Sequence, residues 1–243
     1  MINGLLNSQC NKDFNMNIID AHTHIDYITN RIQPNVESVI CCSVCEDDWE
    51  NLINIINSDK NVYGAFGIHP WHLESIKDGW ENRLYDLLNA NRNFMVGEIG
   101  LDKYKPNMEK QISVFTKQLE IAIRLKRNVF LHCVGAWDKI FQILKRYKRS
   151  ELPLIIAHGF NGSDEILHNL LNNYNVMISF SKINKDLDSN RIQEIDINKI
   201  LIETDGKSDI NLSELINTIS EIKNNTDIPN IIYNNTKQVL QNG

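Results

Sequence analysis

The chain has 243 residues, of which 42% are hydrophobic, 8% aromatic and 23% charged. These fractions are typical of a globular protein with its own core, and they exclude disordered and fibrous classes. The formal net charge of −6 disfavours nonspecific coating of nucleic acid, because a phosphate ligand then needs local cations or a bound metal ion. We expect a cytoplasmic protein, since neither a membrane span nor a signal peptide is evident, and nothing indicates an obligate protein partner.

The first predicted elements are strands. Residues 1–16 are polar and without periodicity, so we expect a loose N-terminal extension ahead of a single domain over 17–243. Eight apolar runs of strand length then recur along the chain. Their high Val and Ile content is typical of strands buried on both faces, as in a parallel sheet covered by helices. The runs occupy 17–22, 36–44, 62–69, 94–100, 129–133, 152–158, 176–180 and 199–204.

Stretches with helical spacing separate most of these runs. The clearest spans about 109–127, where Ile112, Phe115 and Leu119 form one apolar stripe. The polar linker 182–199 has the weakest helix signal. Eight strands alternating with helices, without a repeat or a Gly/Pro-rich boundary, predict the α/β class and a single (β/α)8 TIM barrel. Further helices are expected at 47–58, 78–91, 137–148, 164–172 and 212–223.

Six side chains of metal-binding types stand at the ends of five predicted strands. In a closed barrel these ends share one rim, where the active sites of this fold are built. Two of the six, His22 and His24, are two residues apart and therefore face the same side of their strand. Any single histidine among them would fit a buried core residue equally well, but their convergence indicates a metal site. The six are His22, His24, Glu98, His132, His158 and Asp205.

Six motifs spread over nearly the whole chain resemble one family. They are IIDAHTHID (18–26), GIHPWH (67–72), VGEIGLD (96–102), LHC (131–133), AHGFNGS (157–163) and LIETD (201–205). Together they resemble the TatD-type metal-dependent hydrolases of the amidohydrolase superfamily. The resemblance implies an amidohydrolase-like barrel and a deoxyribonuclease or phosphoesterase activity, with phosphoester substrates that include DNA. It also implies that the six residues named above are metal ligands, with Glu98 in the bridging position if two ions bind.

The expected chemistry is hydrolysis by a metal-activated water at the barrel rim. We expect one or two divalent ions, drawn from Zn, Mn, Mg, Ni and Co. Such an ion lowers the pKa of its water from 15.7 to about 7 and neutralises a phosphoryl oxygen. Asp205 is predicted to be catalytic because it is suited to accept the proton of that water as well as to bind the ion. Glu98 is predicted to be catalytic because a bridging ligand would hold two ions against the attacking and leaving oxygens.

Other residues at the same rim have two interpretations each. His69 ends the third strand and is predicted to bind substrate or to support the ligands, with a buried histidine beside Pro70 as an equal alternative. Lys103 follows the fourth strand and is predicted to attract a phosphate, with an ordinary solvated lysine as its alternative. Asp102 is a candidate to orient a ligand histidine.

Trp71 and Trp137 follow the third and fifth strands, where each either stacks on a base or packs beneath a loop.

The chain also departs from the family pattern in three segments. GKSD (206–209) follows LIETD in place of Ala-Pro, KYKPN (103–107) replaces an aromatic pair, and CVGAWDK (133–139) replaces an arginine-bearing stretch. The acidic charge and the missing arginine favour an alternative, a metal-dependent hydrolase of carbon–nitrogen or carboxyl-ester bonds. A non-catalytic binding barrel is a third hypothesis.

Overall fold

Eight strands form one sheet in the computed structural model, which describes residues 17–30, 33 and 35–241. Neighbouring strands in the order β1 to β8 pair in parallel. Each strand overlaps one of the predicted apolar runs, whereas the extension predicted at 1–16 lies outside the described residues. The strands are β1 (Ile18–Thr23), β2 (Val36–Cys42), β3 (Val62–Phe66), β4 (Met95–Asp102), β5 (Val129–Val134), β6 (Ile155–Ala157), β7 (Val176–Phe180) and β8 (Ile200–Ile202).

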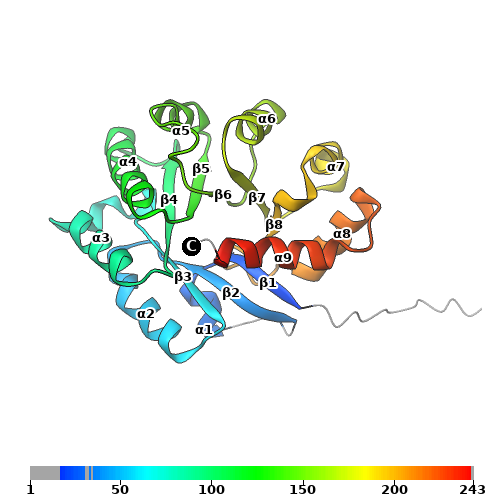
Figure 1. Cartoon of the computed structure of the whole chain (residues 1–243), viewed down its shortest axis with the longest axis horizontal. Coiled ribbons are helices and arrows are strands. Elements are labelled where there is room, and N and C mark those ends of the chain that lie inside the picture. Colours follow the sequence, from blue (N-terminus) through cyan, green and yellow to red (C-terminus); the bar gives the residue numbers. More distant parts are fainter. Residues whose placement is uncertain (1–16, 31–32, 34, 242–243) are drawn as a thin grey trace, which may run out of the picture.

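Helices surround the strands, and Figure 1 shows the strands in the middle with most of the helices on the outside. This arrangement confirms the predicted TIM barrel. The helices are α1 (Ile25–Asn30), α2 (Trp49–Ser58), α3 (Trp80–Ala90), α4 (Met108–Leu125), α5 (Trp137–Leu144), α6 (Asp164–Asn173), α7 (Lys185–Glu194), α8 (Leu212–Lys223) and α9 (Ile228–Gln241). Short 3-10 turns occupy Glu46–Asp48, Pro70–Ser75 and Ile197–Lys199.

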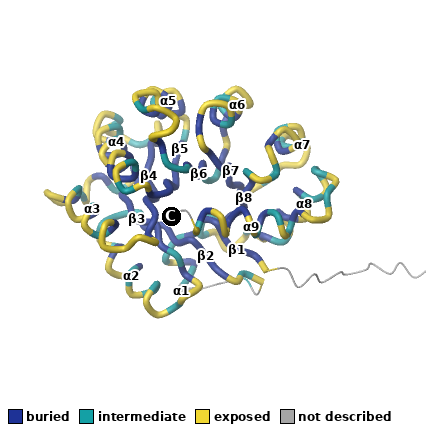
Figure 2. The backbone as a smooth tube through the Cα atoms, viewed as in Figure 1, coloured by how far each residue is buried: buried dark blue, intermediate teal, exposed yellow. Residues whose placement is uncertain are grey.

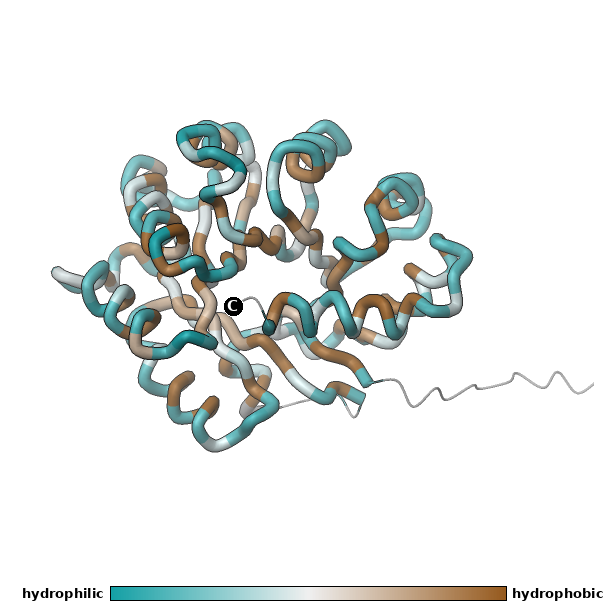
Figure 3. Tube along the Cα trace, in the orientation of Figure 1, coloured by the Kyte–Doolittle hydropathy of each residue, from teal (hydrophilic) through white to brown (hydrophobic). Residues whose placement is uncertain are grey.

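Two apolar clusters fill the protein. The larger lies between the strands and the helices, where strands that are buried throughout meet one face of each helix. Figures 2 and 3 show this pattern as buried, hydrophobic strands and helices whose outer turns are exposed and hydrophilic. The smaller cluster contains residues of all eight strands, such as Met95 and Phe130, together with Val239 of α9. Because Met95 and Phe130 lie near the amino ends of their strands, α9 covers that end of the barrel.

Hydrogen bonds join β1 to the segment that follows β8. The N–H and the hydroxyl of Thr204 donate to the two carboxyl oxygens of Asp20 at 3.0 and 2.6 Å. The N–H of Asp205 donates to the carbonyl oxygen of His22 at 3.0 Å. Asp20 is fully buried, and this burial raises its pKa to about 7. These bonds bring two predicted ligands, His22 and Asp205, side by side at the rim.

Three helices were predicted weakly or not at all. α7 forms within the polar segment 182–199 and buries one side chain, Ile192. α1 and α9 were not predicted, although α9 inserts Val239 into the barrel interior.

Among the described residues, no helix has the length and apolar character needed to cross a membrane. The cytoplasmic location stays a prediction.

Candidate active site

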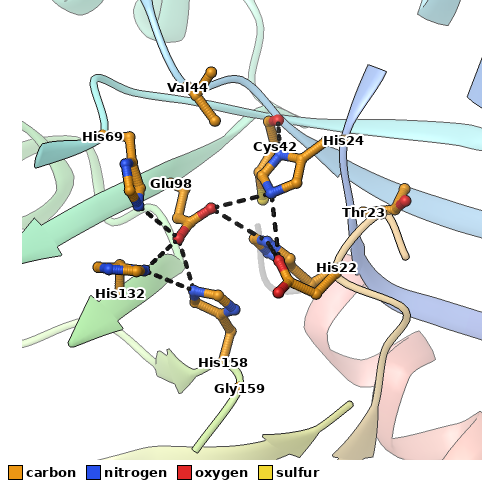
Figure 4. Close-up of polar contacts among 12 residues, drawn as sticks. His22, Thr23, His24, Cys42, Val44, His69, Glu98, His132, His158 and Gly159 are labelled. Carbon is orange, nitrogen blue, oxygen red and sulfur yellow. Dashed lines mark hydrogen bonds and ion pairs between the residues drawn. The ribbon is translucent and has the colours of Figure 1, made fainter. Parts of the chain in front are cut away.

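The carboxylate of Glu98, on β4, lies at the centre of the rim, and one of its oxygens faces the end of β1 (Figure 4). Glu98 Oε2 lies 3.3 Å from His22 Nε2 and 3.4 Å from His24 Nε2. The same two ring nitrogens lie 3.7 and 3.5 Å from Asp205 Oδ1. His24 is oriented through its other nitrogen, Nδ1, which lies 3.0 Å from the carbonyl oxygen of Cys42. The first half of the site therefore joins two histidines and two carboxylates.

The other oxygen of Glu98 faces three more histidines. Glu98 Oε1 lies 2.8 Å from His132 Nδ1, 2.7 Å from His158 Nε2 and 3.2 Å from His69 Nε2. His69 accepts a hydrogen bond at Nδ1 from the backbone N–H of Trp71 at 3.2 Å, so the proton of its neutral ring lies on Nε2 and points at Glu98. The two oxygens of one carboxylate thus face two separate sets of side chains.

The electrostatics of the cluster are dominated by burial and by its opposite charges. Burial raises the pKa of Glu98, but the charge of His158, the adjacent His69 and the hydrogen bonds of the histidines outweigh it and hold that pKa well below its usual value. Burial lowers the pKa of His158, but Glu98 and Glu203 outweigh it and raise that pKa well above its usual value. Burial lowers the pKa of His69 to about 4. The centre of the cluster is therefore a carboxylate at neutral pH.

Several ring nitrogens in this cluster are buried without a hydrogen-bond partner among the described residues. They are both ring nitrogens of His22 and Nε2 of His132. An unpaired polar atom in the interior is costly unless it binds something, and a divalent ion is such a partner for imidazole. Three groups of side chains bring their ligand atoms within 4.8 Å of one another. They are His22, Glu98 and His158; His22, His24 and Asp205; and His69, Glu98 and His132.

A pocket of about 420 Å³ opens over this cluster. His132, His158 and Asp205 lie in its wall, and Lys182 and Lys207 bring two cations. Lys207 Nζ lies 2.5 Å from Asp205 Oδ2, whereas Lys182 has no partner among the residues described. The rest of the lining is Trp71, Val134, Gly159, Phe160, Asn161 and Ser181. With two lysines and one carboxylate at its wall, the pocket suits an anionic ligand.

Comparison with known proteins identifies the family. Residues 19–241 match the family described as TatD related DNase. The chain belongs to this family. The match confirms the resemblance seen in the six motifs, and with it the expected class of enzyme, a metal-dependent hydrolase.

Individual relatives of this TatD-family chain differ in how much of their own length the chain covers. An uncharacterized metal-dependent hydrolase of Buchnera aphidicola is 28% identical over 213 residues, which are 83% of this chain and 77% of that protein. The human 3'-5' RNA nuclease TATDN2 is 28% identical over 165 residues, which are 65% of this chain but only 21% of the human protein. The crystal structure of YjjV, a TatD homologue from Escherichia coli K12, has a TM-score of 0.80 at 22% identity and covers 93% of this chain and 98% of its own.

The six residues predicted as ligands are brought together by this fold, and the other predicted residues are distributed differently. His69 joins the cluster beneath the pocket through Glu98 and is not part of the pocket lining. Lys103 is also absent from that lining, because its side chain lies against Gly135 and its Nζ is 5.0 Å from the centre of the Tyr104 ring. Lys182 and Lys207, which the sequence analysis did not select, supply the cations instead.

Asp102 and the two tryptophans, Trp71 and Trp137, also take up different positions in the structure. Asp102 Oδ2 accepts a hydrogen bond from Trp71 Nε1 at 2.7 Å and lies 3.9 Å from His132 Nε2, so it orients the tryptophan more closely than the histidine. Trp137 is buried and packs against Phe160, among other rings, whereas Trp71 is exposed at the pocket. Of the two interpretations of these tryptophans, packing beneath a loop therefore applies to Trp137.

Glu203 is a further residue of the site that the sequence analysis missed. It is fully buried beyond the end of β8, and its Oε1 accepts a hydrogen bond from the N–H of Gly159 at 2.7 Å. The same oxygen lies 3.2 Å from His158 Nδ1. A carboxylate behind a histidine fixes the orientation of the ring and raises its basicity. The available signal was the position of Glu203 two residues before Asp205 in LIETD.

Glu203→Gln is expected to lower kcat/KM for a phosphodiester by about 10- to 100-fold, the usual effect of removing such a supporting carboxylate. The amide keeps an oxygen for Gly159 but loses the charge that faces His158. Steady-state rates at increasing metal concentration measure this effect, because a misoriented His158 should also raise the metal requirement. Glu221→Gln, which changes an exposed glutamate paired with Lys185, is the matched control. Equal rates in the two variants would refute the role of Glu203.

Proposed function

We propose that this chain is a metal-dependent phosphodiesterase that hydrolyses nucleic-acid strands, DNA among them, in the pocket at the barrel rim. The observation that carries the proposal is the position of the buried Glu98 carboxylate, whose two oxygens face separate sets of nitrogen and oxygen donors. Such an arrangement suits two divalent ions held by one bridging carboxylate, the layout typical of phosphodiester hydrolysis. Relatives named as RNA and single-stranded DNA nucleases support the same chemistry.

The donor set fits first-row divalent ions. His22, His24 and Asp205 would hold one ion with Glu98 Oε2, and His132 and His158 would hold a second with Glu98 Oε1. Imidazole nitrogens together with carboxylate oxygens favour Zn, Mn, Co or Ni, and Mg is the alternative with fewer nitrogen ligands. When bound, such ions supply a water of lowered pKa and positive charge beside a phosphoryl oxygen.

The residues of the pocket and of the cluster beneath it have separate roles in the proposed reaction. Asp205 accepts the proton of the attacking water, because its carboxylate lies in the wall of the pocket. Burial raises the pKa of Asp205, but hydrogen bonding from His24 and the charges of His22 and His158 outweigh it, as does Lys207, and keep it ionised. Lys182 and Lys207 attract the phosphates of the substrate. His69 acts as a positioning residue, since its Nε2 faces Glu98.

Removal of metal is expected to abolish turnover of bis-p-nitrophenyl phosphate. Purified protein would be analysed for metal content and assayed before and after EDTA, and then with Mg, Mn or Zn restored separately. We expect activity to disappear with the chelator and to return with at least one ion, because the attacking water has no other activator of comparable strength. His22→Ala should lose both bound metal and turnover.

Two results would contradict this proposal in different ways. Metal-loaded protein that leaves both bis-p-nitrophenyl phosphate and DNA intact would refute the phosphodiesterase. If the same protein turned over amides or lactones, the alternative hydrolase of carbon–nitrogen or carboxyl-ester bonds would replace it. Full activity in Asp205→Asn would refute the assignment of the general base.

A further inference from the structure

Two large aromatic side chains are exposed beside the pocket. Among the described residues, the exposed large hydrophobic side chains are Trp71, Tyr104 and Leu187, with 55%, 75% and 75% of their surfaces accessible. Trp71 belongs to the pocket wall. Its Nε1 donates to Asp102 Oδ2 at 2.7 Å, and the backbone N–H of Tyr104 donates to the other oxygen, Oδ1, at 2.8 Å. One buried carboxylate therefore holds both aromatic residues at the same side of the rim.

A lysine accompanies each of these rings. Lys105 Nζ lies 4.1 Å from the centre of the Trp71 ring, and Lys103 Nζ lies 5.0 Å from the centre of the Tyr104 ring. Neither lysine forms an ion pair with a carboxylate within the part of the chain that the structure describes. Their charges thus remain available to an anion that approaches the rings. This local excess of positive charge contrasts with the net charge of −6 of the whole chain.

We propose that Trp71, Tyr104, Lys103 and Lys105 form an aromatic–lysine platform on which unpaired bases of a nucleic-acid strand stack as the strand enters the pocket. The proposal rests on the proposed function and assigns the strand's path outside the reaction centre. Aromatic rings bind any base through its face, and lysines beside them neutralise the connecting phosphates. Bases in a duplex already stack on their neighbours, so the platform selects single strands.

The exposure of Tyr104 indicates that its ring has little structural role. Among the described residues, the ring contact of Tyr104 is with Lys103, and 75% of the surface of Tyr104 is accessible to solvent. Trp71 differs, because its backbone holds His69 and its indole contacts Asp102. Tyr104 is therefore the better probe of stacking. Leu187, equally exposed but on α7 and without an aromatic ring, is the matched control.

Binding of a 12-nucleotide single strand with cleavage-resistant phosphorothioate linkages to metal-loaded protein tests the platform. Tyr104→Ala is expected to raise Kd by about 5- to 150-fold, the range for loss of one stacked base. Tyr104→Phe should restore the affinity, and Leu187→Ala should match the parent protein. Binding should also quench tryptophan fluorescence, because Trp71 is the exposed member of the four tryptophans and Trp49, Trp80 and Trp137 are buried. Trp71→Phe should remove the quench.

Three results would overturn the platform. They are equal Kd values for Tyr104→Ala and Leu187→Ala, equal affinity of the parent protein for a blunt duplex of the same sequence, and binding without a change in fluorescence. Turnover of bis-p-nitrophenyl phosphate by the protein without these substitutions reports on the proposed function separately. A protein that stacks the strand through Tyr104 but hydrolyses no phosphodiester would keep the platform and refute the proposed function.

Discussion

Glu98→Gln is expected to lower kcat/KM for bis-p-nitrophenyl phosphate by at least about 10³-fold, which corresponds to about 4 kcal/mol of lost transition-state stabilisation. The substitution keeps the volume of the side chain and one oxygen. It replaces the other oxygen by a nitrogen and removes the negative charge that five histidines face. An amide nitrogen donates hydrogen bonds and does not bind a cation, so one half of the site loses its shared ligand.

Metal content and steady-state kinetics of the same preparation measure the effect. We expect Glu98→Gln to retain fewer metal ions per chain as well as to lose activity. Glu194→Gln is the matched control, because Glu194 also contacts a histidine, with its Oε2 2.8 Å from His168 Nε2, but does so at the surface. Activity within tenfold of the parent enzyme, with full metal content, would show that Glu98 does not bridge two ions.

The barrel was predictable because its strands are buried on both faces. A strand such as Val176–Phe180 is almost continuously apolar and buried along its whole length, and eight such runs leave few alternatives. α9 was not predictable in the same way. Its buried positions include Asn235 and Thr236, whose side chains donate to backbone carbonyl oxygens, so polar residues interrupt the apolar stripe. The periodicity of apolar residues does not register such a helix.

The sequence predicted which ligand residues form the candidate site, but not the side-chain contacts that support them. His22 lies near the end of β1 and Asp205 just beyond the end of β8, and barrel closure brings those ends together. The role of Glu203 depends on a contact with His158 from a neighbouring part of the rim, which the strand pattern does not contain. The expectation for Lys103 illustrates the same limit. Its position after β4 placed it at the rim, but its side chain turned to Gly135 and Tyr104, and loops after β7 and β8 supplied the lysines of the pocket.

Gly100→Ala is the second change for which we expect a large effect, here on stability. Gly100 pairs with His132 across β4 and β5 and has a φ of +155°, in the region that favours glycine. A Cβ atom at this position would lie 1.8 Å from the carbonyl oxygen of His132. Because the obstacle is backbone, the two strands must separate. We expect a loss of at least about 2 kcal/mol in the free energy of unfolding, within the range for mutations that strain the backbone.

Thermal unfolding measures this loss, and a second glycine separates its causes. At about 2–4 °C per kcal/mol for a chain of this size, Tm should fall by about 4–8 °C. Gly79→Ala is the control, since Gly79 also has a positive φ, +77°, but its added Cβ would meet only the end of the Arg83 side chain at 3.3 Å. If the two variants lost equal stability, conformational strain alone would explain both. A larger loss in Gly100→Ala, accompanied by lower metal content, would show that close packing of β4 against β5 positions His132 beside Glu98.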